Sequence, residues 1–316
     1  MKKRGFTQIV IFLICGGTNA LAQSMGQGLV DSLKQVTNQL SDAKKLQGWH
    51  YSGITNITFS QVGLLNWTAG GNSSTSIIGL GMYKAQYLHD NVTWNSYLEL
   101  GYGLSKIGDV EFRKSDDRII LVSQAGIAAR QMMSYSLLVD FRTQFTNGRN
   151  YVAAFDSTLG DYPLTSTFLA PAFLTTALGV EIKPLNGLSL LFAPLTGRTT
   201  IVANQLLSEQ GAFNVVKGNT IQSFLGSLIN AQFSDEIVEH VQLNSRLNLF
   251  SPFSSPTLMV ISMENLLSMK VNSFIKVTLS LDAFYDDRII IKRADGTSGP
   301  SAQLKNTFGV GFGYTF

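Results

Sequence analysis

The sequence is poor in charge and almost free of cysteine. Only 14% of its 316 residues are charged, against roughly 25% in a typical soluble domain. The hydrophobic share of 45% is ordinary, so the chain has little charge with which to cover a water-exposed surface. The single cysteine, Cys15, falls in a segment that we expect to be removed. We therefore expect neither a disulfide nor a thiol nucleophile in the mature protein.

The first 22 residues have the pattern of a secretory signal peptide. Basic residues occupy positions 2–4, an apolar stretch follows at 9–14, and Ala-Leu-Ala at 20–22 precedes Gln23. The isoleucine before Cys15 argues against a lipoprotein signal, which favours a small residue there. We predict cleavage after Ala22, a short periplasmic segment at 23–48, and a barrel domain at 49–316.

Cleavage would also remove the excess of positive charge. Lys plus Arg falls from 24 to 21, because three basic residues are lost, and this equals the 21 Asp plus Glu. The basic balance of the whole chain thus gives no indication of a nucleic-acid partner, and we expect none. Residues 23–45 carry leucine and valine at helical spacing, which predicts a short amphipathic helix, with a lumen plug as the alternative.

A long apolar run is missing as well. After the leader no stretch approaches the roughly 18 apolar residues that a membrane helix needs. From Trp49 onward the apolar residues recur at every second position instead. In 135–145, Tyr135, Leu137 and Val139 alternate with Ser136 and Asp140. The alternating segments exceed the roughly 5–6 residues of a soluble strand and suit the roughly 9–11 residues of a membrane-spanning one.

The connections between these segments alternate in length. The second, fourth, sixth, eighth and tenth are short, whereas 147–170 and 195–219 are long. Short periplasmic turns opposite long external loops are typical of outer-membrane barrels. We predict an all-β fold, a single antiparallel transmembrane outer-membrane β-barrel of about twelve strands. The expected strands are 52–65, 74–88, 91–105, 118–129, 135–146, 171–183, 187–194, 220–233, 237–250, 257–270, 274–286 and 303–316.

The last strand is aromatic or aliphatic at alternate positions, with glycine or threonine between them. Because an unpaired backbone group costs several kcal/mol in hydrocarbon, we expect this strand to pair with the first and close the barrel. The terminal pattern resembles the assembly signal of outer-membrane barrels, which implies recognition by the barrel-assembly machinery; a terminal strand of a soluble β protein is the alternative. The residues concerned are Phe308, Val310, Phe312, Tyr314 and Phe316.

The chain also resembles a family of exported β-barrels whose function is unknown. The resemblance implies the outer membrane of a Gram-negative cell and no established biochemical role. It covers most of 49–316 and rests on six segments: NWTAGGNSS (66–74), TWNSYLELGYGLSK (93–106), KSDDRIILVSQAG (114–126), DFRTQFTNG (140–148), STFLAPAFLTTALGV (166–180) and LFAPLTGRTT (191–200).

Charged residues of both signs have the parity of the lumen face. One interpretation is a packed polar network that holds the shape of the barrel, since buried charges must pair. The other is a narrow ion- or solute-binding path, with Arg142 and Arg246 as an anion-attracting constriction. The candidates are Glu99, Asp140, Arg142, Glu181, Arg246, Glu264, Lys276 and Asp282.

No catalytic or metal-binding residues are predicted. A barrel lipase would need a serine–histidine pair facing lipid, whereas His240 has lumen parity near the periplasmic end of its strand. The pairs 116–117 and 286–287 are aspartates that could add oxygen ligands for calcium, but we interpret them as solvated loop residues. No cofactor is expected.

Three functions remain open for such a barrel. The first is a passive pore or conduit for small solutes or lipids. The second is surface binding through the long loops 147–170 and 195–219, and the third is a lipid-modifying enzyme of the outer membrane. We expect a monomer in contact with outer-membrane lipid. Aromatic residues near strand ends predict interfacial girdles: Trp67, Tyr87, Trp94, Tyr102 and Tyr135.

Overall fold

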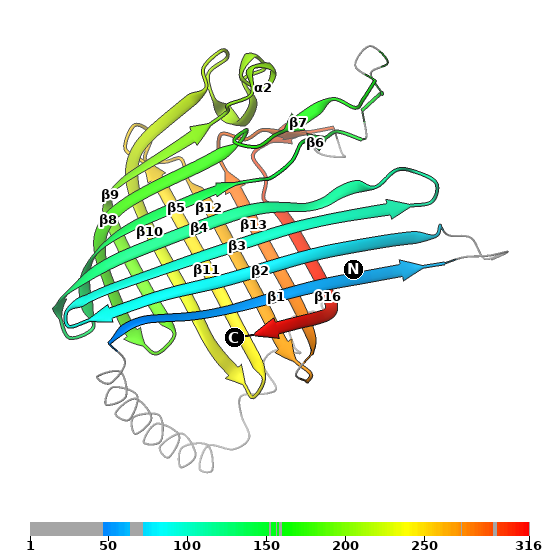
Figure 1. Cartoon of the computed structure of the whole chain (residues 1–316). Helices are drawn as coiled ribbons and strands as arrows, with labels where there is room; N and C mark the ends of the chain where they lie inside the picture. The colour runs from blue at the N-terminus through cyan, green and yellow to red at the C-terminus, as the bar shows by residue number, and fades with distance from the viewer. Residues whose placement is uncertain are drawn as a thin grey trace, which may run out of the picture. The chain divides into compact units, whose positions relative to one another are not determined.

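A closed antiparallel barrel of twelve strands dominates the computed structural model (Figure 1). The structure describes residues 47–63, 72–151, 153–155, 157, 160–272, 274–292 and 296–315. The predicted leader, the predicted helix at 23–45, Trp67 and Phe316 lie outside these residues. Within them, no helix has the length and apolar character needed to cross a membrane. The predicted fold class and strand number are confirmed.

The strands follow the chain around the barrel, and each pairs with its neighbours in sequence. Two small sheets stand apart, one formed by β6 (Gly148–Arg149) and β7 (Leu164–Ser166), the other by β14 (Ile291–Lys292) and β15 (Ser298–Gly299). The barrel strands are β1 (Gly48–Val62), β2 (Ser74–His89), β3 (Val92–Ile107), β4 (Arg113–Arg130), β5 (Met133–Thr143), β8 (Ala172–Leu185), β9 (Leu188–Ile201), β10 (Ile221–Val238), β11 (Val241–Pro252), β12 (Val260–Lys270), β13 (Ile275–Asp286) and β16 (Gln303–Thr315).

The period of two sorts side chains between the outside and the lumen. On β5, Leu137 is 49% exposed on the outside, whereas the next residue, Leu138, is 1% exposed within the barrel. Large apolar residues cover the outer face of many strands, including Phe59, Phe192 and Phe308. Successive side chains of a strand point to opposite faces, so the alternation seen in the sequence becomes the outer and inner surface of the cylinder.

The two rims differ as predicted. Tight turns close one rim at 90–91, 131–132, 186–187, 239–240 and 271–274. The prediction for His240 is wrong in its details. It lies in the turn between β10 and β11 with φ 67°, and its side chain is largely exposed. A left-handed backbone conformation at His240 lets the chain reverse direction within a two-residue turn, so this residue lies outside both strands.

The prediction that β9 ends near residue 194 is also wrong, since the strand continues to Ile201. Pro194 and Gly197 suggest a loop in the sequence. Pro194 instead falls in a register shift between β8 and β9, where its missing N–H is tolerated. A Cβ on Gly179 of β8 would lie 2.1 Å from the Phe192 carbonyl oxygen, so the bulge needs glycine there. The loop predicted at 195–219 therefore occupies 202–220.

The two longest loops on the opposite rim are folded rather than extended. Loop 144–171 contains β6 and β7, and loop 202–220 contains the short helix α2 (Gln205–Glu209) and the 3₁₀ turn η1 (Ala212–Asn214). Ala170 of the first loop is buried together with Val202, Leu207 and Val215 of the second. The Ala203 N–H donates to the Leu169 carbonyl at 3.0 Å. The two loops thus form one packed unit above the barrel.

The barrel closes through a short seam between its first and last strands. Four register pairs join β1 to β16, from Ile54↔Thr315 to Ile57↔Phe312. By contrast, β1 and β2 are paired along the full length of β1. The N-terminal part of β16 pairs with β13, and Figure 1 shows β16 bending toward β1 near its end. The predicted pairing of the last strand with the first is confirmed. The pairing is confined to the last four residues of β16, 312–315.

We expect a disulfide to form across this seam in the variant Thr55→Cys/Tyr314→Cys. The two residues are register partners, and opposite residues of antiparallel strands bring Cβ atoms within about 4.5–5.5 Å. Cys15 is the only cysteine of the chain and lies in the predicted leader, so a protein produced from Gln23 onward offers a background free of cysteine. A mobility shift on non-reducing gels after mild oxidation measures the bond. The matched control, Thr55→Cys/Phe308→Cys, should stay unlinked, and equal linkage of both variants would contradict the register.

Candidate functional site

Ionic and hydrogen-bonding side chains meet across the middle of the lumen. We call this group the cross-lumen belt. It comes from eight strands, and its contacts join walls that are far apart around the barrel. Its members are Lys84 (β2), Tyr97 and Glu99 (β3), Arg118 (β4), Asp140 and Arg142 (β5), Arg246 (β11), Glu264 (β12) and Asp282 (β13), with Ser234 on β10 as a further polar partner.

Arg118 is the centre of one half of the belt. Its guanidinium lies 3.0 Å from Glu99 Oε1 on the neighbouring strand and 3.1 Å from Asp282 Oδ2 on β13. Asp116 Oδ2 lies 3.5 Å away on the same strand. In the ring of strands, β4 and β13 are separated by four strands on one side and six on the other. The Arg118–Asp282 ion pair therefore spans the lumen.

Glu264 is the centre of the other half. Arg142 donates to its Oε1, and Arg246 lies 3.3 Å from its Oε2. Arg142 also binds Asp140 through two nitrogen–oxygen contacts of 2.7 Å each, the bidentate geometry that gives strong ion pairs. Because at least four strands lie between β5 and β12 in either direction, the Arg142–Glu264 contact also crosses the interior.

Two contacts join strands that are diametrically opposed. Lys84 Nζ donates to Ser234 Oγ at 2.9 Å, from β2 to β10. The Arg246 guanidinium lies 5.0 Å from the centre of the Tyr97 ring, from β11 to β3. Each pair of strands has five strands between them in both directions. Four basic residues face four acidic ones in the belt, so it carries no net formal charge.

The structure brings together six of the residues that the sequence proposed. Glu99, Asp140, Arg142, Arg246, Glu264 and Asp282 lie in the belt. Lys276 is buried beside β16 near the start of β13, opposite Gly311. Glu181 forms a separate group near the turn rim, where it accepts hydrogen bonds from Ser134, Ser136 and Ser189. Neither has a belt residue among its register partners on the adjacent strands.

Sequence reasoning missed Arg118, Arg198 and Lys84. Arg118 stood at the predicted edge of its strand, and Arg198 stood in a predicted loop. The true strand boundaries carry both into the lumen. Lys84 had the parity of the lumen face within a predicted strand, so its position was available from the pattern. The Arg118 side chain packs against Gly101 of β3. A Cβ on Gly101 would come within 2.9 Å of the Arg118 side chain, so glycine leaves the space that the arginine occupies.

The interpretation of Asp116 and Asp117 as solvated loop residues is wrong. Asp116 is buried and lies 2.5 Å from the Lys305 Nζ. Asp117 accepts hydrogen bonds from Lys114 Nζ at 2.8 Å and from the backbone N–H groups of residues 145 and 146. The two carboxylates point to different partners. Asp116 pairs with Lys305 and Arg118, and Asp117 pairs with Lys114. The two carboxylates therefore do not converge as calcium ligands must.

Asp286 and Asp287 separate in the same way. Asp286 is buried and binds Arg288 through contacts of 2.9 and 2.7 Å. Asp287, just beyond β13, accepts from the Tyr285 hydroxyl at 2.6 Å and from the Met259 N–H at 2.7 Å. These donors, the tyrosine first, lower the pKa of Asp287 below its ordinary value. No group of three metal-ligating side chains occurs among the residues that the structure describes.

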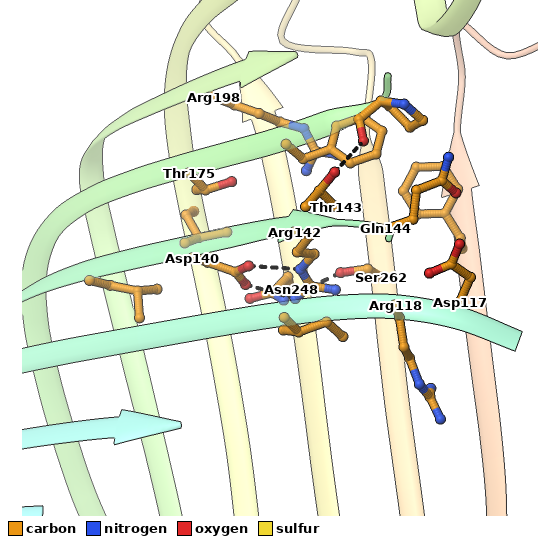
Figure 2. Close-up of a pocket in the computed structure, with 16 residues that line it drawn as sticks. Asp117, Arg118, Asp140, Arg142, Thr143, Gln144, Thr175, Arg198, Asn248 and Ser262 are labelled. Atoms are coloured by element: carbon orange, nitrogen blue, oxygen red, sulfur yellow. Dashed lines mark hydrogen bonds and ion pairs between the residues drawn. The ribbon is translucent and has the colours of Figure 1, made fainter. Parts of the chain in front are cut away.

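A cavity of about 270 Å³ lies between the belt and the loops (Figure 2). Belt residues Arg118, Asp140 and Arg142 line it on one side, and Gln144 and Pro171 line it near the loop rim. Aliphatic and aromatic side chains complete the wall, together with Arg198 and a few hydroxyl and amide groups. The belt thus borders the cavity on the side of the turn rim.

A family model confirms the resemblance seen in the sequence. The model is described as "Protein of unknown function (DUF3078)" and matches residues 59–149. This stretch includes β2, β3, β4 and β5, and with them belt residues such as Arg118 and Arg142. No curated protein matches the chain in sequence.

Several solved structures are similar to the chain. The translocator domain of the autotransporter NalP from Neisseria meningitidis has 11% identity and a TM-score of 0.36, with 93% of this chain and 98% of that chain covered. An outer-membrane channel from Pseudomonas putida F1 has 7% identity and a TM-score of 0.37, with 86% and 96% covered. OmpT, an outer-membrane protein of Vibrio cholerae, has 7% identity and a TM-score of 0.29, with 85% and 97% covered.

We expect Glu264→Gln to destabilise the barrel because two arginines share this carboxylate. Losing a charged hydrogen-bond acceptor should reduce the free energy of unfolding by about 1.5–3 kcal/mol. Guanidinium titration of the protein in detergent micelles, followed by tryptophan fluorescence, measures the change. Glu111→Gln, in the exposed loop 108–112, is the control and should unfold like the wild type. Equal stability of both variants would show that the belt contributes nothing.

Proposed function

We propose that the protein is an outer-membrane β-barrel that serves as a narrow conduit for small polar solutes, with the cross-lumen belt as its constriction. The observation that carries this proposal is the contact between opposite walls. Side chains of Lys84 and Arg246 reach partners on strands halfway around the barrel. A lumen bridged in this way is too narrow at that level for an open, water-filled pore, while its charged lining favours polar over apolar passengers.

The outer surface supports the membrane location. Apolar side chains are exposed around the barrel wall, which would be unfavourable in water over so large an area. Aromatic residues gather at its two ends. Near the turn rim the Trp49 ring lies 5.1 Å from Tyr87 and 5.7 Å from Trp94. Near the loop rim Tyr102 and Phe145 are 6.4 Å apart. Aromatic belts at two levels match the two interfaces of a bilayer.

The last strand supports assembly into that membrane. The side chains of Phe308, Val310, Phe312 and Tyr314 are all exposed on the outer face. This row is available both to lipid and to a protein that recognises alternating apolar residues. We include the barrel-assembly machinery among the expected partners on this ground. The glycines between them face inward, where Gly311 closely approaches Asn56 and Thr58 of β1.

Conductance in planar bilayers tests the conduit. We expect the purified wild-type barrel to give small current steps, because the belt obstructs the lumen. The double variant Arg118→Gln/Asp282→Asn removes one ion pair that spans the lumen and should give clearly larger steps. Arg130→Gln changes an exposed residue near the turn rim and should conduct like the wild type.

Two results would contradict the conduit. Large wild-type steps would show that the belt does not constrict the lumen. Electrical silence of both the wild type and the double variant, in protein whose heat-modifiable migration on gels demonstrates a folded barrel, would show that the lumen does not conduct.

Surface binding is a second candidate, favoured by an aromatic cluster on the loops. Arg113 lies 4.3 Å from the centre of the Tyr151 ring, and Tyr151 packs against Tyr162 at 5.1 Å. Phe155 contacts Tyr162 and is still mostly exposed. Exposed aromatics on ordered loops are common in binding surfaces. If this is the function, Phe155→Ala should weaken adhesion of cells to an extracellular target and leave conductance unchanged.

A further inference from the structure

Arg198 differs from every other arginine around the cavity. The extension of β9 past Pro194 carries its side chain into the cavity wall. Figure 2 shows the side chain directed into the same space as Thr143 and Arg142. Among the described residues, Arg118 is paired with Glu99, Asp116 and Asp282, and Arg142 with Asp140 and Glu264, whereas Arg198 has no ion pair or hydrogen bond.

The surroundings of Arg198 are aromatic. Its guanidinium carbon lies 5.7 Å from the centre of the Phe173 ring and 5.9 Å from that of Phe250. A cation next to ring faces is stabilised by their negative potential. This contact leaves the hydrogen-bond donors of the guanidinium unused. A guanidinium has five N–H donors in a planar fork. Arg198 is half-buried, and it presents these donors at the cavity wall without an acceptor from the described residues.

The charges around the cavity leave one positive charge in excess. Arg118, Arg142 and Asp140 belong to the neutral belt, and Asp117 is paired with Lys114. Arg198 is therefore the lining charge that no carboxylate balances. The nearby pair Asp286–Arg288 is neutral as a unit, with Arg288 stacked 4.6 Å above the Phe224 ring. The cavity is thus suited to one negative charge, placed at Arg198.

The other side chains that line the cavity indicate the chemistry of the uncharged part of the ligand. Apolar side chains from several strands face the cavity, among them Leu138, Leu228 and Phe284. Hydroxyl and amide groups of Thr175, Asn248 and Ser262 are interspersed. The volume of about 270 Å³ is slightly below the roughly 300–1,000 Å³ of drug-sized sites. A volume of this size suits a small ring compound better than a lipid tail or a polypeptide.

We propose that this cavity is a binding site for a small organic monoanion, a carboxylate attached to a flat apolar body, with Arg198 as the residue that binds the carboxylate. The planar fork of arginine matches the two carboxylate oxygens. The aromatic walls and Leu138 contact the apolar body. The site deepens the proposed function by naming the class of solute, and it rests on that function for the idea that solutes enter from the loop rim.

Direct binding tests this site without requiring conduction. Isothermal titration calorimetry of the full barrel in detergent micelles would use benzoate as the probe, with benzamide as its neutral counterpart of the same shape. We expect saturable binding of benzoate and much weaker binding of benzamide. Arg198→Gln should lower the affinity for benzoate by about ten-fold or more, as expected for loss of a charge-assisted hydrogen bond. Arg130→Gln, at the turn rim, should bind like the wild type.

The outcomes separate the site from the conduit. Absence of saturable benzoate binding, or equal binding of benzoate and benzamide by the wild type, would overturn the site, and neither comparison depends on a variant that folds. Equal benzoate affinity of Arg198→Gln and the wild type would overturn the role of Arg198. Stronger binding of inorganic phosphate than of benzoate would contradict the proposal that the ligand has an apolar body. Benzoate binding by a barrel that is electrically silent would support the binding site and contradict the proposed conduit.

Discussion

Backbone hydrogen bonding in a medium without water is the constraint on which this structure depends. A β-sheet in hydrocarbon cannot keep an open edge, because each unpaired N–H or C=O costs several kcal/mol. The twelve long strands satisfy this constraint by forming a ring. Closing the ring requires only four register pairs between β1 and β16. Once the ring is closed, the period of two decides which side chains face outward and which face the lumen.

The cross-lumen belt follows from that sorting. Polar residues excluded from the outer face collect inside a cylinder of limited width, and charged residues there must find partners. They find them on distant strands, as the Arg118–Asp282 and Arg142–Glu264 contacts do. The belt balances its own charges, so it can act as a neutral, rigid partition. Arg198 lies beyond that balanced set, on the loop side. The proposed ligand site therefore borders the network and shares Arg118, Asp140 and Arg142 with it.

Much of the fold could be predicted because alternation is a property of each strand alone. All twelve strands were recognisable, and so were the inward positions of Glu99, Asp140 and Arg246. The end of β9 was not, because Pro194 and Gly197 have the local character of a loop, and only the bulge opposite Gly179 explains their place in a strand. Because β9 was predicted to end before Arg198, the inward position of this arginine was missed.

The partners of the inward residues could not be predicted at all. Periodicity places a side chain on the lumen face but does not say how far around the ring its neighbour lies. Glu264 meets its register partner Arg246, which strand order alone could suggest. Its contact with Arg142, whose strand is separated from β12 by at least four others, depends on the curvature of the closed barrel and the reach of both side chains. Such contacts are properties of the assembled cylinder.

A nitroxide scan along β5 in liposomes tests most directly whether the apolar face of the barrel meets lipid. Single labels at residues 135–139 would be compared for collision with oxygen, which is concentrated in lipid, and with a water-soluble nickel chelate. We expect a period of two, with labels at Tyr135, Leu137 and Val139 open to oxygen and labels at Ser136 and Leu138 shielded from it. Uniform accessibility along the strand, or nickel contact at Leu137 equal to that of an exposed loop, would contradict a barrel whose apolar face meets lipid.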